Sequence, residues 1–425
     1  MSTEPALWAS AAGGLILMEA PSSAYPRGTA GAGQTTSRRG GDLRRFYTRP
    51  HHFYGGIDLH ARSMYVCILN RDGEIVVHRN MKASPDALRQ VIAPYRDDLV
   101  VAVECLFTWY WLADLCAQEG IPFVLGHALY MKAIHGGKAK HDTIEAHTIA
   151  VLLRGGMRPH AYVYPAERRA TRDLLRRRMS LMRQRAALLT HVQHTNSQDK
   201  RPEIGKKLAY KANREGGAAR FPEPAVQHSI EVDLALLNAY DRLLTELERS
   251  LVNTATTHKA QIFYRLRSIP GGGKILALVL LYAIHHIHRF PRVQEFVSSG
   301  RLVKGAKESA GKRYGTSGTQ IGNAYLTWAF SEAAVRCLRA NPAGQTSLAR
   351  LEKQHGQGKA LTILAHQLAR AVYDMWRRDT VFDLDKFLQC IMERSGRARR
   401  LTGHPGDQPG NRVLAWRIRC VVERV

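Results

Sequence analysis

The sequence has few cysteines and no long apolar run, and both absences narrow the class of protein. Its six cysteines lie far apart along 425 residues, without a CxxC pair. This usage predicts small core residues in a reduced compartment rather than disulfides or a zinc site. No stretch approaches the roughly 18 uncharged residues that span a bilayer. The short apolar run at residues 15–18 lacks a basic flank, so no signal peptide is expected. We therefore expect a cytoplasmic protein without a membrane segment.

Acidic residues are also scarce relative to basic ones. The chain has 36 Asp and Glu against 62 Lys and Arg, which gives a net charge of +26. Because Lys and Arg contacts to phosphate dominate nucleic-acid affinity, this excess predicts a polyanionic partner. Apolar residues make up 45% of the chain, which allows two or three domains with packed cores.

Composition and periodicity divide the chain into five parts. Residues 1–52 are rich in Ala, Gly, Ser, Pro and Arg and lack periodicity, which predicts a disordered extension. Residues 53–160 alternate strand and helix patterns, typical of an α/β domain around one mixed sheet. Residues 161–260 contain two long helical patterns, expected to form an antiparallel arm or coiled coil. Residues 261–390 are mainly helical in pattern, and residues 391–425 resemble a basic tail.

Four acids in the α/β domain are candidates for one site. Asp58 lies in the first strand of a predicted β-meander, and Glu104 ends a second buried strand. Asp142 and Glu145 are three residues apart at a predicted helix start, so they share a helix face. Carboxylate oxygens are ligands that Mg²⁺ prefers, and two such ions ~4 Å apart can assist phosphodiester chemistry.

Each acid also has a simpler explanation. Asp142 and Glu145 fit the pattern of a helix capping box. Glu104 can end its strand in solvent, and Asp58 can pair with one of the many arginines. A buried carboxylate that is neither solvated nor paired is costly, which leaves a bound cation as the third possibility for Asp58.

Basic residues in three places before residue 300 are candidate nucleic-acid contacts. They are Lys138 and Lys140 in a basic loop, Arg172, Arg176 and Arg177 on the first long helix, and Lys274. Lys274 follows a Gly-rich turn between two helices, whose backbone N–H groups can hold a phosphate. A solvated arginine face is the alternative for the long helix.

Six segments, taken in order, are similar to the motifs of one known family. They are Gly56-Ile57-Asp58-Leu59-His60, Val103-Glu104, Lys140-x-Asp142-x-x-Glu145-Ala146, Arg267-Ser268-Ile269-Pro270-Gly271, Glu308-Ser309-Ala310-Gly311-Lys312-Arg313-Tyr314-Gly315 and Ile321-Gly322-Asn323-Ala324-Tyr325-Leu326. Over about residues 53–390 the chain resembles the DEDD transposases of bacterial insertion sequences. The resemblance implies an RNase H/RuvC-like domain followed by a helical C-terminal transposase domain.

The resemblance also implies a mechanism and partners. Asp58, Glu104, Asp142 and Glu145 would form a tetrad that binds Mg²⁺. Ser309 would be the nucleophile that becomes linked to DNA, with Lys307, Lys312 and Arg313 beside the phosphate. A structured guide RNA would pair with donor and target DNA. A homo-oligomer, either a dimer or a tetramer, would bring the parts together.

The chain departs from the family pattern at Glu145, at Gly272 and in its N-terminal extension, and two other functions compete with the first. Glu145 stands where the family usually has Asp, and Gly272 stands where it usually has an apolar residue. A RuvC-like, Mg²⁺-dependent, structure-specific endonuclease would use water and need no serine. A catalytically impaired remnant would bind nucleic acid without cutting it. Ser317 is the nearest rival of Ser309, and the histidines at 285, 286 and 288 are expected to contact phosphate or solvent rather than a metal.

Overall fold

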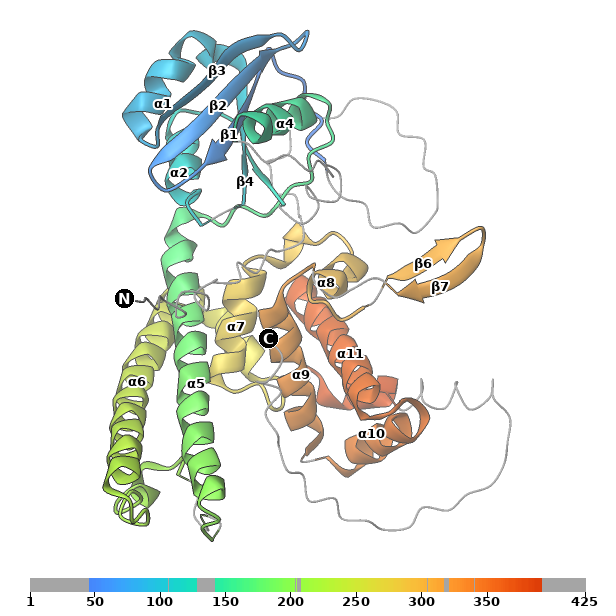
Figure 1. The fold of residues 1–425 in the computed structure, drawn as a ribbon. Coiled ribbons are helices and arrows are strands. Elements are labelled where there is room, and N and C mark those ends of the chain that lie inside the picture. Colours follow the sequence, from blue (N-terminus) through green and yellow to red (C-terminus); the bar gives the residue numbers. More distant parts are fainter. Residues whose placement is uncertain are drawn as a thin grey trace. The chain divides into compact units, whose positions relative to one another are not determined.

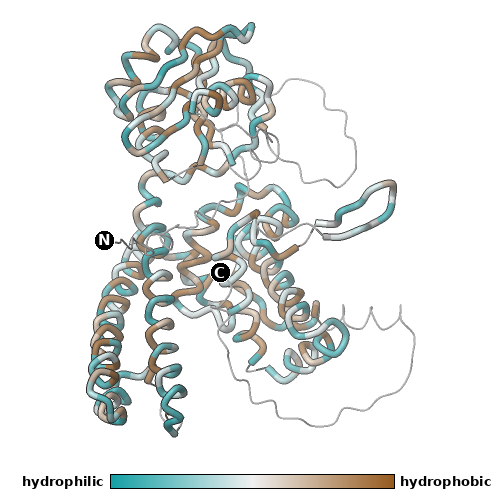
Figure 2. The backbone as a smooth tube through the Cα atoms, viewed as in Figure 1, coloured by the Kyte–Doolittle hydropathy of each residue, from teal (hydrophilic) through white to brown (hydrophobic). Residues whose placement is uncertain are grey.

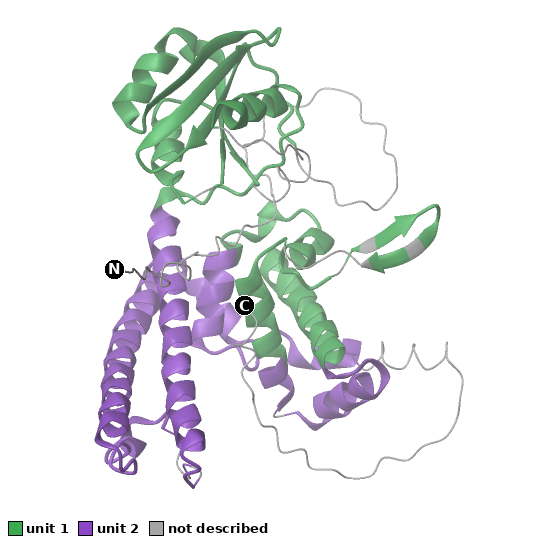
Figure 3. Ribbon diagram, in the orientation of Figure 1, with its two compact units in different colours: residues 1–166, 284–334, 358–380 green, residues 167–283, 335–357, 381–425 purple. Residues whose placement is uncertain are grey.

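The computed structural model describes residues 46–391, except residues 106, 128–141, 203, 205–207, 304, 317–320 and 340. In this part the chain forms two compact units, each built from segments that are distant in sequence (Figure 3). Unit 1 comprises residues 46–166, 284–334 and 358–380, and unit 2 comprises residues 167–283, 335–357 and 381–391. No described helix is both long and apolar enough to cross a membrane.

A five-stranded mixed sheet organises the first segment of unit 1 (Figure 1). Its strands are β1 (Phe53–Leu59), β2 (Ser63–Asn70), β3 (Ile75–Lys82), β4 (Leu99–Glu104) and β5 (Phe123–Gly126). Their order across the sheet is β3-β2-β1-β4-β5. β1 pairs with β2 in antiparallel fashion and with β4 in parallel fashion, so the expected meander is present. The two strands that carry acids are neighbours in the middle of the sheet.

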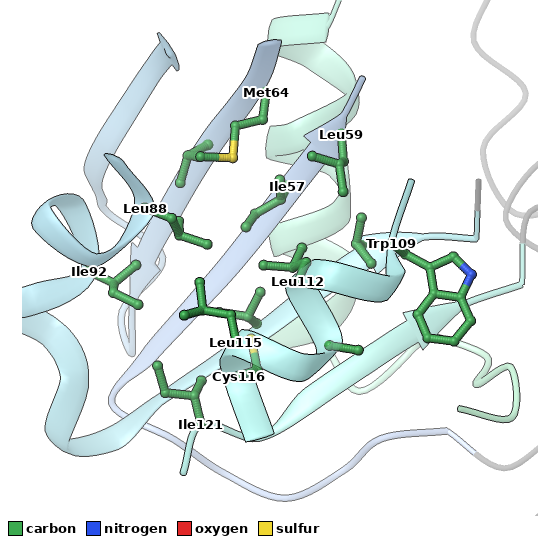
Figure 4. Packing of buried hydrophobic residues seen from close by; sticks show 14 of the residues in the cluster. Ile57, Leu59, Met64, Leu88, Ile92, Trp109, Leu112, Leu115, Cys116 and Ile121 are labelled. Carbon is green, nitrogen blue, oxygen red and sulfur yellow. The ribbon is translucent and has the colours of Figure 1, made fainter. Parts of the chain in front are cut away.

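Helices cover both faces of this sheet. The helices are α1 (Pro85–Ile92), the 3-10 helix η1 (Ala93–Asp98), α2 (Tyr110–Gln118) and α4 (Asp142–Arg154). Figure 4 shows side chains of α1 and α2 packed on one face, with α4 behind the strands. The expected RNase H-like α/β domain is therefore confirmed, and the sheet and helices bury a core on each side.

Alternation along the strands decides which face each acid reaches. Ile57 and Val103 belong to the core under α1 and α2, whereas Ala102 belongs to the core under α4. Successive strand residues point to opposite faces. Asp58 follows Ile57, and Glu104 follows Val103, so both acids face α4.

The described residues include a segment before the boundary expected at Phe53. Tyr47 and His51 are buried, and the His51 ring bonds the Tyr47 hydroxyl and the Asp98 carboxylate at 2.6 Å each. Residues 46–52 were expected to belong to the disordered extension, but this network ties them to the end of η1. A patterned apolar stretch is absent there, which is why composition alone missed the packing.

The rest of the described chain is helical apart from one hairpin, and the helical C-terminal region is thereby confirmed. The helical elements are α5 (Ala166–Gln198), η2 (Lys211–Asn213), α6 (Pro224–Arg267), α7 (Lys274–Ile284), η3 (Ile287–Arg289), α8 (Val293–Ser299), α9 (Ala324–Arg339), α10 (Pro342–His355) and α11 (Gln357–Arg378). The hairpin consists of β6 (Ala306–Ser309) and β7 (Lys312–Thr316). Figure 2 shows α7 as largely hydrophobic, whereas the hairpin is mainly hydrophilic.

Helices α5 and α6 form the antiparallel pair expected from the sequence. Two ion pairs and one hydrogen bond join them at matching positions: Arg178–Glu248 at 2.7 Å, Arg185–Asp241 at 2.6 Å and, as the hydrogen bond, His191–Asp233 at 2.5 Å. Val192, Ile230 and Leu237 pack at their far end. As residue numbers rise on α5 they fall on α6, so the arginines of α5 serve partly to hold the pair together.

Candidate active site

The sheet places the carboxylates of β1 and β4 next to each other. Ile57 pairs with Val103 in the parallel ladder, so the following residues, Asp58 and Glu104, occupy neighbouring positions. Both lie at the carboxyl ends of their strands. The ends of parallel strands meet at one edge of a sheet, which is where α/β folds commonly build their sites.

Helix α4 brings two more acids to the same face. It packs so closely on β1 that a β carbon on Gly56 would overlap backbone atoms of Ala146 and Ala150. This close approach needs a residue without a side chain in the strand. Asp142 and Glu145 lie in the first turn of α4, so the contact at Gly56 holds them over the end of β1.

Asp58 is a buried carboxylate in an unfavourable electrostatic environment. It is 2% exposed, and its Oδ2 atom has no hydrogen-bond partner among the described residues. Burial is the main reason that its pKa rises from 3.8 to about 6, and the nearby His60 opposes this rise. Repulsion from Glu145, Asp142 and Glu104 raises the pKa further. No arginine partner of Asp58 is found among the described residues.

His60 lies between two of the acids and was not selected from the sequence. Its Nε2 atom is 3.4 Å from Oδ2 of Asp58 and 3.5 Å from Oδ2 of Asp142. One ligand atom from each of these three residues lies within 4.8 Å of the others. The available signal was its position two residues after Asp58, which places both side chains on one face of an extended strand.

Glu104 and Glu145 surround this group without belonging to it. Both are close enough to raise the pKa of Asp58, but their oxygens do not complete the three-residue cluster. Arg158 lies near Glu104; it is fully buried, and its guanidinium nitrogens make no hydrogen bond to the part of the chain that the structure describes. Burial lowers the pKa of Arg158 to about 9, and attraction to Glu104 opposes this effect. Arg158 is thus a buried positive charge beside the acids that the sequence did not reveal.

Ser309 lies at the tip of the β6–β7 hairpin. Ala310 and Gly311 form its two-residue turn, with φ of 49° and 74°. Positive φ at both positions is typical of the tight turns that join twisted antiparallel strands. Every residue from 307 to 312 is exposed. The region was expected to be mainly helical, so the hairpin is a difference from the sequence-based expectation.

The register of the hairpin gathers positive charge around the serine. Ser309 pairs with Lys312, and Glu308 pairs with Arg313. Directly opposed residues share a face, and so do residues two apart on one strand. Ser309, Lys312 and Lys307 therefore share one face, whereas Glu308 lies on the other. The only acid of the hairpin is thus kept away from the serine.

Hydrogen bonds clamp the base of the hairpin. Nε of Arg301 donates to the carbonyl of Gly322 at 2.9 Å, and the N–H of Asn323 donates to the carbonyl of Ser299 at 2.7 Å. Asn323 also caps α9, since its Oδ1 accepts from two backbone N–H groups of the first turn. The Ile321–Leu326 motif therefore anchors the segment that presents Ser309.

Several residues expected to bind nucleic acid lie outside the described residues. They are Lys138, Lys140 and the side chain of Arg313; the rival serine, Ser317, is also outside. Lys274 begins α7 after the expected turn between two helices. Its Nζ is 3.2 Å from Oε2 of Glu248, and its side chain is 55% exposed. Lys274 thus retains access to a phosphate.

The three arginines selected on α5 differ in exposure. Arg172 is 8% exposed, which speaks against a direct contact with phosphate. Arg176 is half-buried and lies 3.9 Å from the Asp173 carboxylate, whereas Arg177 is exposed. Arginines on this helix therefore divide between an internal and an external role, which a charge count does not distinguish.

Of the histidines at 285, 286 and 288, His285 has a structural partner, whereas His286 and His288 are exposed. Nδ1 of His285 lies 2.6 Å from the hydroxyl of Tyr162, and His285 adopts φ of 59°. The neighbouring Arg289 is buried, with its guanidinium carbon 4.2 Å from the centre of the Tyr162 ring. His285 was expected to contact phosphate or solvent, and this hydrogen bond gives it a role in packing instead.

Comparison with known families agrees with this arrangement. Residues 55–195 match a family described as a transposase, of the DEDD type of IS110 elements, and residues 264–349 match the Transposase IS116/IS110/IS902 family. The two matches together cover more than half of the chain. No curated protein matches it. The first match includes all four acids and the second includes the serine hairpin. The chain therefore belongs to the IS110 family of DEDD transposases, enzymes of DNA transposition.

Proposed function

We propose that this transposase cuts and rejoins DNA through Ser309, with Asp58, Glu104, Asp142 and Glu145 holding a divalent cation of the Mg²⁺ class. The observation that carries the proposal is the environment of the Oδ2 atom of Asp58. This atom is buried, lacks a hydrogen bond to any described residue and lies within 4.8 Å of a carboxylate oxygen of Asp142. Such an atom is costly unless a cation binds it, because a buried charge needs a partner.

The residues present fit a cation. The donor set is dominated by carboxylate oxygens, as Mg²⁺ and Mn²⁺ prefer. The raised pKa of Asp58 reports mutual repulsion that a bound cation would relieve. A divalent cation held there would neutralise charge at the scissile phosphate and would make a hydroxyl bound to it more acidic. Glu145 is one methylene longer than the usual Asp, which changes the reach of its oxygens.

The hairpin supports Ser309 as nucleophile. Its Oγ would attack phosphorus, and the bond from phosphorus to one deoxyribose oxygen would break, so that oxygen leaves as a hydroxyl. Lys307 and Lys312 share the face of Ser309 and would hold the non-bridging phosphate oxygens. The clamp at Arg301 and Gly322 would fix the direction from which the serine approaches.

The partners are proposed on charge and family. DNA binding follows from the family, and a net charge of +26 suits a complex with much phosphate. We include a structured guide RNA that pairs with donor and target DNA. We also include assembly into a dimer or tetramer, in which the exposed Ser309 of one copy meets the acids of another.

A strand-exchange assay tests this function. The full chain is incubated with Mg²⁺, a duplex carrying the joined element ends, a target duplex and the transcript of the adjacent noncoding DNA. Wild type should exchange strands, whereas Asp58→Asn and Ser309→Ala should each lose at least about 100-fold. Cleavage that survives Ser309→Ala but not Asp58→Asn would instead indicate an endonuclease that uses water. Tight binding without cleavage, restored to cleavage by Glu145→Asp, would indicate an impaired copy.

A further inference from the structure

His60 is the one member of the three-residue cluster that the proposed tetrad does not use. The backbone turn after β1 is closed by a hydrogen bond in which the His60 N–H donates to the carbonyl of Ser63 at 2.9 Å. Its side chain is 47% exposed, whereas that of Asp58 is 3% exposed. His60 therefore lies between the solvent and the buried carboxylate, on the path by which a cation would reach Asp58.

The distances at His60 are longer than good hydrogen bonds. Charge-assisted N–H···O bonds are about 2.7–2.9 Å long. The Nε2 atom is instead 3.4 Å from Asp58 and 3.5 Å from Asp142, and Oδ2 of Asp58 has no hydrogen bond within the described ranges. Two ligands of one cation, at bond lengths of about 2.1 Å, lie about 3.0–3.5 Å apart. Both distances from Nε2 therefore suit ligands of one ion better than an imidazole that bridges two acids.

We propose that Nε2 of His60 is a nitrogen ligand of the same divalent cation that Asp58 and Asp142 bind. This inference rests on the proposed metal site. It adds that the site binds Mn²⁺ more tightly than Mg²⁺, because imidazole is a good ligand for transition metals and a poor one for Mg²⁺. Asp58 supplies the buried charge, Asp142 the solvent-side oxygen and His60 the selectivity.

The competing explanation is that His60 is a counter-ion. A protonated imidazole would then neutralise Asp58 and Asp142 in the absence of metal and would leave when a cation binds. The two explanations predict opposite results for bound Mn²⁺, since only a ligand leaves its nitrogen next to the ion. Removing a counter-ion would also strengthen cation binding, whereas removing a ligand weakens it.

Mn²⁺ binding to the full chain tests the proposal without relying on activity. Chelator-treated protein is titrated with Mn²⁺ and with Mg²⁺ by calorimetry, and bound Mn²⁺ is examined by electron spin-echo envelope modulation. Wild type should show ¹⁴N modulation from one imidazole. His60→Gln should lose it, with Mn²⁺ affinity at least about 10-fold weaker and Mg²⁺ affinity changed less. His60→Asp should restore binding without nitrogen and shift preference toward Mg²⁺.

His228→Gln is the matched control, because His228 lies on α6 and its side chain is 79% exposed. This variant should bind Mn²⁺ as wild type does, with nitrogen modulation intact. Wild-type Mn²⁺ without ¹⁴N modulation, or unchanged or tighter Mn²⁺ binding in His60→Gln, would overturn the role of His60 while leaving the metal site standing. Failure of wild type to bind either cation would overturn the proposed metal site itself.

Discussion

Gly56 of β1 lies directly against Ala146 of α4, with no room for a β carbon between them. This contact joins the strand that carries Asp58 to the helix that carries Asp142 and Glu145. It is backbone against backbone, so no side-chain movement can relieve a larger residue at this point. The geometry of the acids therefore depends on one glycine that carries no chemistry itself.

Substitution of that glycine tests the dependence. Gly56→Ala should push α4 away from β1, lower stability by about 1–3 kcal/mol and weaken Mn²⁺ binding at least about 10-fold. Gly55→Ala is the control, because its β carbon would make ordinary contacts of 3.5–3.6 Å. Both substitutions lower the conformational entropy of the unfolded chain equally, so a difference between them comes from the folded state. Denaturant unfolding and calorimetry should separate them; equal effects would show that the approach of α4 does not position the acids.

Removing the charge of Asp58 should stabilise the metal-free protein. Its pKa is raised from 3.8 to about 6, and one pKa unit corresponds to about 1.4 kcal/mol, so Asp58→Asn should gain about 3 kcal/mol at pH 7.5. The same variant should lose the rise in melting temperature that divalent cations give wild type. A metal-free Asp58→Asn protein less stable than wild type would mean that the carboxylate has a favourable partner.

The same carboxylate predicts a pH dependence of stability without metal. Between pH 3.8 and about 6 the folded protein keeps the Asp58 proton that the unfolded chain has released. The contribution of Asp58 to the unfolding free energy therefore falls as pH rises through this window and is constant above it. Subtracting the profile of Asp58→Asn from that of wild type isolates the effect. A difference that is flat, or that grows with pH, would contradict the burial of this charge.

Asp241 should be an acid on which the stability of the α5–α6 pair strongly depends. It lies 2.6 Å from Arg185 and 2.6 Å from Arg214, whose side chain is 3% exposed. Burial opposes ionisation of Asp241, but hydrogen bonds from both arginines outweigh it and lower its pKa, so its contribution is lost as pH falls. Asp241→Asn should destabilise the chain by about 3 kcal/mol at pH 7. The exposed Glu231→Gln should cost under about 0.5 kcal/mol, and equal effects would show that the pairing is immaterial.

Much of the site is predictable from local patterns, and the rest depends on packing. Strand periodicity places Asp58 and Glu104, and a helix start places Asp142 and Glu145. Their meeting depends on the fit of α4 over Gly56, which no local pattern encodes. His60 follows the end of β1, and its approach to Asp142 depends on the position of α4, which is distant in sequence.

The β6–β7 hairpin and the α5–α6 pair show two other limits of prediction from sequence. Residues 307–312 are all exposed, so they lack the alternation of buried and exposed positions that identifies a half-buried strand. On α5, a run of arginines predicts a basic surface, yet Arg172 and Arg178 are buried. Charge in a sequence does not say whether a guanidinium faces solvent or an acid on the next helix.

The residue that becomes linked to DNA is the most direct test of the proposed reaction. The full chain, Mn²⁺, the joined-ends duplex and the transcript are incubated, and the protein–DNA adduct is digested for mass spectrometry. The nucleotide should be attached to the peptide containing Ser309, and Ser309→Ala should form no adduct. Ser268→Ala, which changes an exposed serine outside the hairpin, should form it normally. A nucleotide on another residue, or an adduct of normal yield from Ser309→Ala, would contradict the account.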